Sequence, residues 1–165
     1  MIPALVVALL ATSEDAESLR ATAPAYLDLA SAREHYAAAR VAGAIFDVDP
    51  ELLLAISWHE SRYVANVVTR EPGRRVSCGV MTPVPHRRSC SAWELSILGG
   101  YIEGARHLRV WIDKCGGDRS CGMTAYAGGG GLVAACRAGS GHRGCYFAGQ
   151  MTARSRRIAR RRLVT

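Results

Sequence analysis

Apolar residues recur at helical spacing along most of the chain. Residues 24–43 are rich in strong helix formers and repeat apolar side chains every three or four positions, which predicts one helix. A second helix is predicted to begin at Asp49 and Pro50 and to run toward Tyr63. The aspartate can cap the first turn, and proline fits the first helical position because a backbone N–H has no partner there.

The pattern continues with interruptions further along the chain. Helical spacing is predicted at residues 91–93, 101–114 and 120–126, and four consecutive glycines follow at 128–131. Residues 66–85 hold three prolines, which predicts a surface loop with a short ordered return. The chain shows no alternating pattern of strand length, no internal repeat and no linker, so we expect one compact all-α domain.

Composition and charge narrow the class of protein. The chain has 165 residues, of which 49% are hydrophobic and 21% charged, which is typical of one globular domain and argues against disorder. The net charge of +7 is concentrated in six arginines among the last twelve residues, so the rest of the chain is nearly neutral. We therefore expect a domain at 21–150 and an arginine-rich tail at 151–165. The tail is either a solvated terminus or a site for an anionic polymer such as cell envelope or nucleic acid.

The apolar stretch at residues 4–11 is shorter than the roughly 20 residues that a membrane-spanning helix needs, and we expect no transmembrane segment. The stretch is similar to the apolar part of a secretory signal, although no basic residue stands near Met1. Residues 1–20 are therefore expected to be either a leader or a short surface segment.

Six cysteines lie at positions 78, 90, 115, 121, 136 and 145. An even number at these spacings favours disulfides and an oxidising compartment. Of the connectivities that six cysteines allow, we expect pairing in sequence order: Cys78 with Cys90, Cys115 with Cys121, and Cys136 with Cys145. A metal site is not expected, because neither the cysteine pairs nor the histidines have zinc-site spacing. Buried free thiols are the other alternative.

Glu60 is the candidate for chemistry. It would lie at the C-terminal end of the second helix, where the negative end of the helix dipole and an apolar cleft both raise the pKa of a carboxyl group. A carboxyl group that is partly protonated near neutral pH can act as a general acid. Asp47 and Asp49 lie at the far end of the same helix, whereas Glu71 could fold back as a second carboxylate. The alternative is an exposed, idle glutamate, and His59 is expected at the surface or the cleft edge.

Four motifs occur in an order that resembles one enzyme family. They are Val48-Asp49-Pro50-Glu51-Leu52-Leu53-Leu54-Ala55-Ile56 leading into His59-Glu60-Ser61-Arg62-Tyr63, then Gly79-Val80-Met81, Gly104-Ala105-Arg106-His107-Leu108 and Ala125-Tyr126-Ala127-Gly128. This set is similar to the soluble-type lytic transglycosylases, whose catalytic domain is related to goose-type lysozyme. The resemblance covers roughly residues 40–132.

The resemblance implies a lysozyme-like helical fold that cleaves peptidoglycan between N-acetylmuramic acid and N-acetylglucosamine. Glu60 would be the single acid and base: it would protonate the glycosidic oxygen and then take the proton of the 6-hydroxyl, which closes a 1,6-anhydro ring. No cofactor would be needed. Ser61 would set the geometry of the helix end, and Gly79 and Met81 would line the sugar cleft. The Tyr126 hydroxyl would bond near Glu60. The alternatives are a capping serine, a core methionine and a core tyrosine.

The chain departs from the family at two positions, because Thr82 stands where the family has glutamine and Ala127 where it has asparagine. Two alternatives therefore stay open: a muramidase that hydrolyses the same bond, and an inactive lysozyme-like domain that binds peptidoglycan. The expected partners are peptidoglycan glycan strands and, through the arginine-rich tail, anionic envelope polymers. Nucleic acid is not expected, because the tail holds no aromatic residue on which a base could stack. The expected location is the periplasm, the cell envelope or the outside of the cell.

Overall fold

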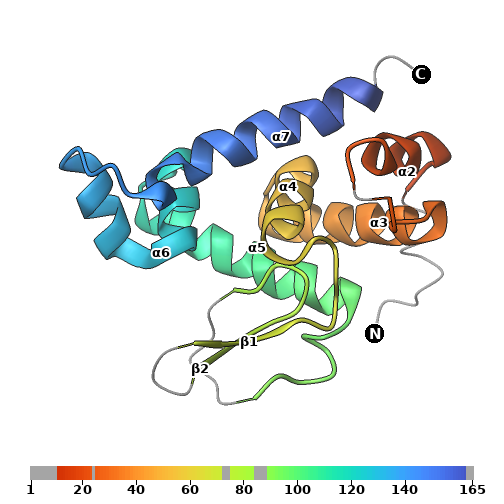
Figure 1. Ribbon diagram of the computed structural model, residues 1–165, viewed down its shortest axis with the longest axis horizontal. Helices are drawn as coiled ribbons and strands as arrows, with labels where there is room; N and C mark the ends of the chain where they lie inside the picture. Colours follow the sequence, from red (N-terminus) through yellow and green to blue (C-terminus); the bar gives the residue numbers. More distant parts are fainter. Residues whose placement is uncertain (1–10, 24, 72–74, 84–88, 163–165) are drawn as a thin grey trace.

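Helices build most of the molecule (Figure 1). The computed structural model describes residues 11–23, 25–71, 75–83 and 89–162. The elements in chain order are the helices α2 (Ser13–Arg20), α3 (Leu29–Phe46) and α4 (Pro50–Ser61), the strands β1 (Val68–Glu71) and β2 (Arg75–Cys78), the helices α5 (Ile97–Lys114) and α6 (Arg119–Arg137), the short 3-10 helix η2 (Arg143–Tyr146) and the helix α7 (Phe147–Arg162). The predominance of helix confirms the expected all-α class, whereas the lysozyme-like topology stays a prediction.

Helix α4 lies in the middle of the helical part (Figure 1). Asp49 caps it, because its Oδ1 accepts hydrogen bonds from the backbone N–H groups of Glu51 (2.8 Å) and Leu52 (3.3 Å), and Pro50 occupies the first turn. Residues 52–57 are buried, and the helix packs against α3 and α7. The predicted helix start at Asp49 is confirmed, and the last turn of α4 is only partly buried.

The core is one continuous cluster to which all helices from α2 to α7 contribute. Its largest fully buried apolar side chains include Leu19, Tyr36, Leu53, Leu54, Ile56, Met81, Tyr101, Leu108, Met151 and Ile158. Because these side chains come from both ends of the sequence, the cluster joins the first and last helices to the central α4.

A small polar network lies inside this core between α3, α4 and α5. The Tyr101 hydroxyl lies 2.7 Å from Ser57 Oγ and 3.2 Å from His35 Nδ1. Burial lowers the pKa of His35 to about 4, so its ring is neutral at neutral pH. Because these buried polar atoms have partners, the network fixes the three helices relative to one another at little cost in free energy.

Residues 66–85, expected to be a surface loop with a short ordered return, contain a β-hairpin. β1 and β2 pair antiparallel, with Val68 opposite Cys78. Val76 and Cys78 are buried, whereas Val68 is 51% exposed. Each strand has only four residues, and β2 has three consecutive buried residues instead of an alternating pattern, so the sequence carries no strand periodicity there. The hairpin lies on the side of the molecule away from α7 (Figure 1).

Two helix boundaries also differ from expectation. Residues 92–95 form turns instead of a helix, and the Glu94 carboxylate accepts hydrogen bonds there from the backbone N–H and the hydroxyl of Ser91 (2.8 and 2.7 Å). Helix α6 begins where predicted but continues past the run of four glycines. Gly128 and Gly129 leave the helical region (φ −161° and 71°), so the helix kinks there and then resumes.

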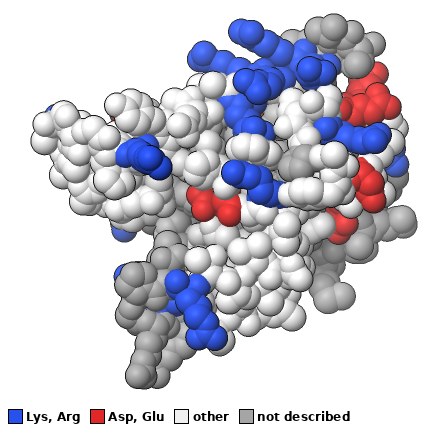
Figure 2. All heavy atoms as spheres, viewed as in Figure 1, with Lys and Arg blue, Asp and Glu red and all other residues white. Residues whose placement is uncertain are grey.

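The arginine-rich segment is not a separate tail in the structure. Helix α7 runs through residue 150 without a break, and its Met151, Ser155 and Ile158 are buried toward α4 and α2. The expected boundary between 150 and 151 therefore lies inside a packed helix. Basic side chains gather over this helix (Figure 2), and the exposed arginines on it are Arg156, Arg157, Arg160 and Arg161.

Helix α2 belongs to the same packed fold. Its Ala16 and Leu19 are fully buried, and the Ser18 hydroxyl donates a hydrogen bond of 2.6 Å to the carbonyl oxygen of Ile158 in α7. Residues 13–20, which were expected to lie in a leader or short surface segment, therefore pack with the rest of the domain. Residues 1–10 lie outside the described part of the chain.

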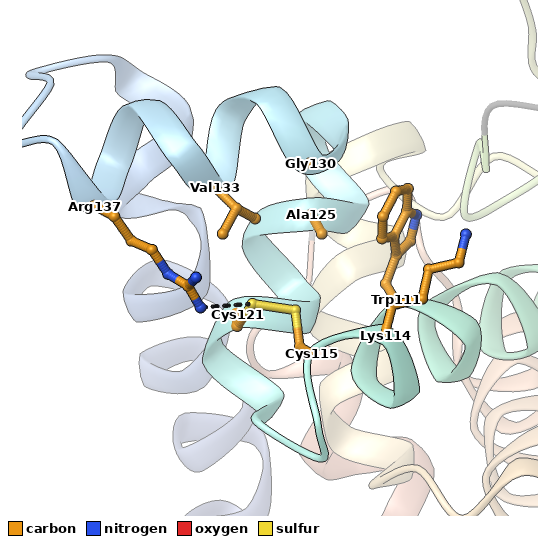
Figure 3. Close-up of a pocket in the computed structure, with 8 residues that line it drawn as sticks. All are labelled: Trp111, Lys114, Cys115, Cys121, Ala125, Gly130, Val133 and Arg137. Carbon is orange, nitrogen blue, oxygen red and sulfur yellow. Dashed lines mark hydrogen bonds between the residues drawn. A yellow bond between two sulfur atoms is a disulfide. The ribbon is translucent and has the colours of Figure 1, made fainter.

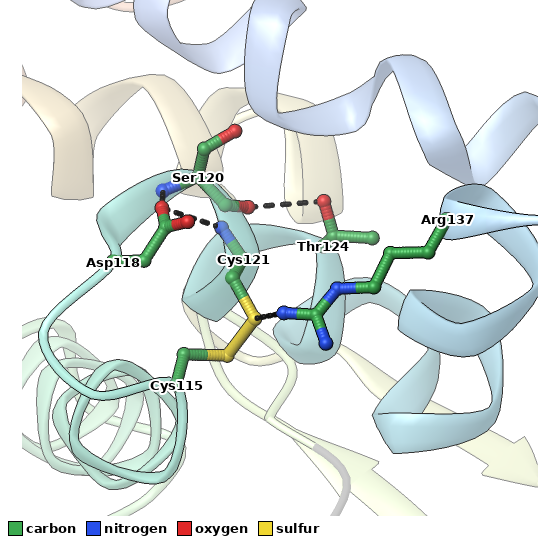
Figure 4. Close-up of a disulfide and its surroundings, with 6 residues drawn as sticks. All are labelled: Cys115, Asp118, Ser120, Cys121, Thr124 and Arg137. Atoms are coloured by element: carbon green, nitrogen blue, oxygen red, sulfur yellow. Dashed lines mark hydrogen bonds between the residues drawn. A yellow bond between two sulfur atoms is a disulfide. The ribbon is translucent and has the colours of Figure 1, made fainter.

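The three disulfides confirm the predicted pairing in sequence order. They join Cys78 to Cys90, Cys115 to Cys121 and Cys136 to Cys145. The second joins the end of α5 to the first turn of α6 (Figure 4), and the third joins the end of α6 to η2. Three disulfides are typical of proteins from an oxidising compartment. Among the described residues, no helix combines the length and the apolar character that crossing a bilayer requires.

Candidate active site

Glu60 lies in the last turn of α4 and lines a cavity of about 660 Å³. Four elements meet around this cavity: α4, the kink of α6, η2 and the start of α7. The lining residues are His59, Glu60, Ala127, Arg143, Gly144, Tyr146, Phe147 and Gln150. The volume falls within the range of small-ligand sites, roughly 300–1,000 Å³. The cavity can therefore hold part of a sugar chain beside the carboxyl group.

Thr82 is the direct partner of Glu60. Its hydroxyl donates a hydrogen bond of 2.7 Å to Glu60 Oε2, across the space between the segment after β2 and the end of α4. The sequence alone predicts a lost polar contact at this position, because threonine stands where the lytic transglycosylases that the sequence resembles have glutamine. The structure instead gives the shorter side chain a contact with the candidate acid.

Tyr126 approaches Glu60 without bonding to it directly. Its hydroxyl donates a hydrogen bond of 2.6 Å to the carbonyl oxygen of Met81, the residue before Thr82. Burial, and after it the charge of Glu60, raises the pKa of Tyr126 well above its usual value. The phenol therefore stays protonated and donates. Tyr126 and Glu60 are thus hydrogen-bonded to two adjacent residues, Met81 and Thr82.

Ser61 and Met81 are buried neighbours of the two residues that form the Glu60–Thr82 hydrogen bond. Ser61 is buried, and its Oγ lies 2.7 Å from the Val80 carbonyl oxygen and 3.1 Å from that of Ser57, so it ties the end of α4 to the segment after β2. The Met81 side chain is fully buried against Gly104 of α5, where an added Cβ would lie 2.5 Å from Met81 Cβ. Ser61 thus joins the end of α4 to the segment after β2, and its role at the site stays a prediction, whereas Met81 has a core position.

The turn after β2, which leads into residues 80–82, requires glycine at position 79. The φ of Gly79 is 79°, and an added Cβ would lie 2.1 Å from the carbonyl oxygen of Glu94. Its backbone N–H donates to the Val67 carbonyl oxygen at 2.9 Å. Gly79 is buried, so it positions the segment that carries Thr82 and does not itself line the cavity.

Rare backbone conformations cluster around Glu60. Arg62 (φ 58°) and Tyr63 (φ 68°) follow α4, and Thr82 (φ 41°) faces its end. Among the described residues, Asp47 is the one other non-glycine residue with a positive φ. Such conformations cost about 1–3 kcal/mol each and gather where function needs a fixed geometry. Arg62 is the left-handed residue at which α4 ends, as Asp47 is for α3, whereas Thr82 has its positive φ where its hydroxyl meets Glu60.

His59 lies at the edge of the cavity, as expected. Its ring packs edge-on against Phe147 with 5.1 Å between ring centroids, which anchors the end of α4 to the start of α7. Partial burial, and after it the charges of Arg62 and Arg154, lowers the pKa of His59. The imidazole is therefore neutral at neutral pH.

Glu60 is the only carboxylic residue among the described residues that line the cavity. Asp47 and Asp49 lie at the other end of α4, where Asp49 caps the helix. Glu71, expected as an alternative second carboxylate, ends β1, and its side chain lies outside what the structure describes. The described lining thus holds a single carboxyl group instead of the carboxylate pair of most glycosidases.

The far wall of the cavity was not predicted from the sequence. Arg143 and Tyr146 of η2 and Gln150 of α7 line it, and Tyr146 is 61% exposed. No helical periodicity points to these residues. The signal in the sequence was the short spacing of Cys136 and Cys145, because that disulfide holds η2 against α6.

A second cavity of about 260 Å³ is lined by residues of α5 and α6 (Figure 3). The Lys114 ammonium lies 4.7 Å from the centroid of the Trp111 ring. Arg137 Nη2 lies 3.8 Å from Cys121 Sγ (Figures 3 and 4). The residues described as lining this cavity include no carboxyl group, so it lacks a general acid. The Glu60 cavity is the better candidate for an active site.

The described residues contain no group of three or more His, Cys, Asp or Glu side chains that could hold a metal ion. The catalytic candidate is Glu60, because it lines the cavity, with Thr82 hydrogen-bonded to it and Tyr126 hydrogen-bonded to the residue before Thr82. Comparisons of the chain with protein-family models, with curated proteins and with solved structures found no match.

Proposed function

We propose that this chain is a peptidoglycan lytic transglycosylase, which cleaves glycan strands between N-acetylmuramic acid and N-acetylglucosamine and leaves 1,6-anhydro ends. The observation that carries the proposal is the setting of Glu60. One carboxyl group at the end of a helix lines a cavity of about 660 Å³ and accepts a hydrogen bond of 2.7 Å from Thr82. A single carboxyl group supports a mechanism in which one residue acts first as acid and then as base.

The reaction needs two proton transfers through Glu60. In the first, protonated Glu60 gives its proton to the glycosidic oxygen, and the bond between that oxygen and C1 of the muramic acid breaks. Positive charge develops at C1, and the acetamido oxygen of the same sugar stabilises it in place of a second carboxylate. In the second, the Glu60 carboxylate takes the proton of the 6-hydroxyl, whose oxygen bonds to C1. Water is not consumed, and Glu60 ends protonated as it began.

Thr82 and Tyr126 support this scheme as positioning residues. The Thr82 hydrogen bond orients the Glu60 carboxyl group, and the buried Tyr126 hydroxyl fixes the Met81 carbonyl directly before Thr82. Glu60 is thus held in place before substrate binds, so little reorganisation is needed during proton transfer.

Ala127 is the reason to test for two alternative functions, a muramidase and a glycan-binding domain that does not cleave. It lines the cavity at the position where the family has asparagine, so one polar side chain is replaced by a methyl group. If water attacks C1 in place of the 6-hydroxyl, the same site is a muramidase. If neither attacks, the domain binds glycan without cleaving it. Product masses separate these outcomes, because an anhydro end is lighter than a hydrolysed end by one water.

The proposal includes a place of action. The three disulfides support an oxidising compartment, which for a peptidoglycan enzyme means the periplasm, the envelope or the outside of the cell. The exposed arginines of α7 would hold the protein on anionic envelope polymers by charge.

Substitution of Glu60 tests the proposed function. Glu60→Gln keeps the shape of the side chain and removes the proton donor, so turbidity loss of purified cell walls should slow by roughly 10²–10⁴-fold. Glu34→Gln makes the same chemical change at an exposed glutamate of α3 and should leave the rate unchanged. Undiminished lysis by the Glu60 variant, with both proteins folded, contradicts the proposed function.

A further inference from the structure

Arg143 supplies the only positive charge among the described residues that line the Glu60 cavity. The other basic residue of the lining, His59, is neutral at neutral pH, because burial and two neighbouring arginines lower its pKa. Arg143 is exposed, and its guanidinium forms no ion pair or hydrogen bond within the described part of the chain. Its charge is therefore available to a ligand that enters the cavity.

Local structure holds Arg143 at the cavity. The 3-10 helix η2 begins after His142, whose Nδ1 accepts a hydrogen bond of 3.1 Å from the Gly144 backbone N–H. Cys145 is bonded to Cys136 at the end of α6. Arg143 is thus presented by a short, cross-linked helix with few conformations to lose when a ligand binds.

The same wall carries an aromatic side chain. Tyr146 lines the cavity and is 61% exposed, and an exposed aromatic ring at a cavity marks a contact surface for a ligand. The carboxyl group of Glu60 is the one acidic group among the described residues that line the cavity. The wall formed by η2 therefore suits a ligand that has an anionic group next to a less polar part.

We propose that Arg143 binds a carboxylate on the substituent that muramic acid carries, and so makes the site selective for muramic acid glycan over neutral glucosamine glycan. This inference rests on the proposed function, because it names the ligand of the same cavity. The carboxylate has two sources: the peptide stem where it is present, and the lactyl group of the sugar where the stem has been removed. The planar guanidinium of arginine binds carboxylates through two parallel hydrogen bonds, which favours arginine in this role.

Binding to three ligands tests this selectivity. All proteins carry Glu60→Gln so that no strand is cut during the measurement. The ligands are glycan strands with peptide stems, strands freed of stems by an amidase, and neutral oligomers of N-acetylglucosamine. Arg143→Gln should weaken binding to at least one of the two muramic acid ligands, the strands with stems and the strands without them. The expected loss is roughly fivefold, the effect of losing one exposed charge pair. Binding to the neutral oligomers should not change.

Two controls separate this effect from general attraction by positive charge. Arg119→Gln removes an exposed arginine that lines a different cavity and should leave all three affinities unchanged. Arg143→Lys keeps the charge and should recover part of the lost affinity. A loss confined to one of the two muramic acid ligands identifies which carboxylate is bound.

The outcomes distinguish this inference from the proposed function. Equal weakening on the neutral oligomers, or no weakening on either anionic ligand, overturns the role of Arg143. If protein with Glu60 intact cuts strands while Arg143→Gln binds all ligands normally, only the inference fails. If that protein cuts no strand while Arg143→Gln shows the selective loss, the proposed function fails and the carboxylate site stands.

Discussion

The Thr82 hydroxyl donates a hydrogen bond of 2.7 Å to Oε2 of Glu60, and so joins the segment after β2 to the last turn of α4. Thr82 has a φ of 41°, and α4, which carries Glu60, ends at Arg62 in the left-handed conformation. The chain therefore changes direction at Thr82 and shortly after Glu60. The orientation of the carboxyl group therefore depends on a tertiary contact as well as on the helix that carries it.

Removal of the Thr82 hydroxyl should slow the proposed reaction while the fold persists. Thr82→Val keeps the branched shape and removes the donor, and we expect lysis of purified cell walls to slow by up to roughly tenfold, because a hydrogen bond to the uncharged acid contributes about 0.5–1.5 kcal/mol. Thr82→Ser keeps the hydroxyl and should retain most of the rate. Equal rates for the two variants would show that the hydroxyl does not position Glu60.

Loss of the Tyr126 hydroxyl should lower stability. Tyr126→Phe leaves the buried Met81 carbonyl oxygen without the donor that now lies 2.6 Å away. We expect the free energy of unfolding in urea to fall by about 1–3 kcal/mol. Tyr146→Phe is the matched control, because that tyrosine is 61% exposed, and it should leave the free energy of unfolding nearly unchanged. A Tyr126 variant as stable as the control would contradict the assigned hydrogen bond.

Buried His35 should make the fold sensitive to acid. Burial lowers its pKa to about 4 in the folded state, whereas the unfolded chain has the ordinary value near 6.5, so below pH 6.5 the unfolded state binds the proton more readily. Stability should fall as the pH drops from 6.5 to about 4, by on the order of 3 kcal/mol, and this contribution should not change further below pH 4.

The contribution of His35 to this acid sensitivity can be measured by comparing the pH dependence of the unfolding free energy in two histidine variants. His35→Gln should have a shallower loss of unfolding free energy between pH 6.5 and 4 than the unaltered protein, whatever its stability at pH 7. His142→Gln, at an exposed position, should keep the original slope. Identical slopes for all three proteins would rule out His35 as the source of acid sensitivity.

The arginines of α7 should bind cell walls by charge. Substitution of its exposed arginines by glutamine should weaken binding to purified cell walls at low salt, and the binding of the unaltered protein should itself fall as salt screens the charges. Truncation after residue 150 is not a valid test, because it removes the buried Met151 and Ile158. The test positions are Arg156, Arg157, Arg160 and Arg161, and the control positions outside α7 are Arg70, Arg106, Arg119 and Arg137. Equal weakening by the two sets would contradict a specific role for α7.

Local signals were sufficient for the elements that the sequence predicted well. Asp49 and Pro50 define the start of α4 through backbone capping alone, and the start of α4 needs no distant partner. Each disulfide joins two cysteines that are neighbours in the order of the sequence, and the loops between them are short, with separations of 12, 6 and 9 residues. Ser61 similarly has the place expected of it, since it lies one residue after Glu60 on the same helix.

The elements that sequence reasoning missed depend on tertiary packing. In α7, the buried Met151, Ser155 and Ile158 recur at helical spacing, but the many arginines between them indicated a solvated tail. In α6, Gly128 and Gly129 kink the helix, which then resumes despite their low helix propensity, and the disulfide between Cys136 and Cys145 joins its end to η2. Thr82 and Glu60 lie 22 positions apart in the sequence and meet only in the folded chain, so residue type alone could not reveal their contact.

The measurement that tests the central claim most directly is the mass of the muropeptides that the unaltered protein releases from purified cell walls. The account predicts muramic acid ends that are one water lighter than hydrolysed ends, produced by the protein with Glu60 and not by the Glu60→Gln variant. Release of only hydrated ends, or no release by folded protein that binds the walls, would contradict a transglycosylase that uses Glu60 as its single acid and base.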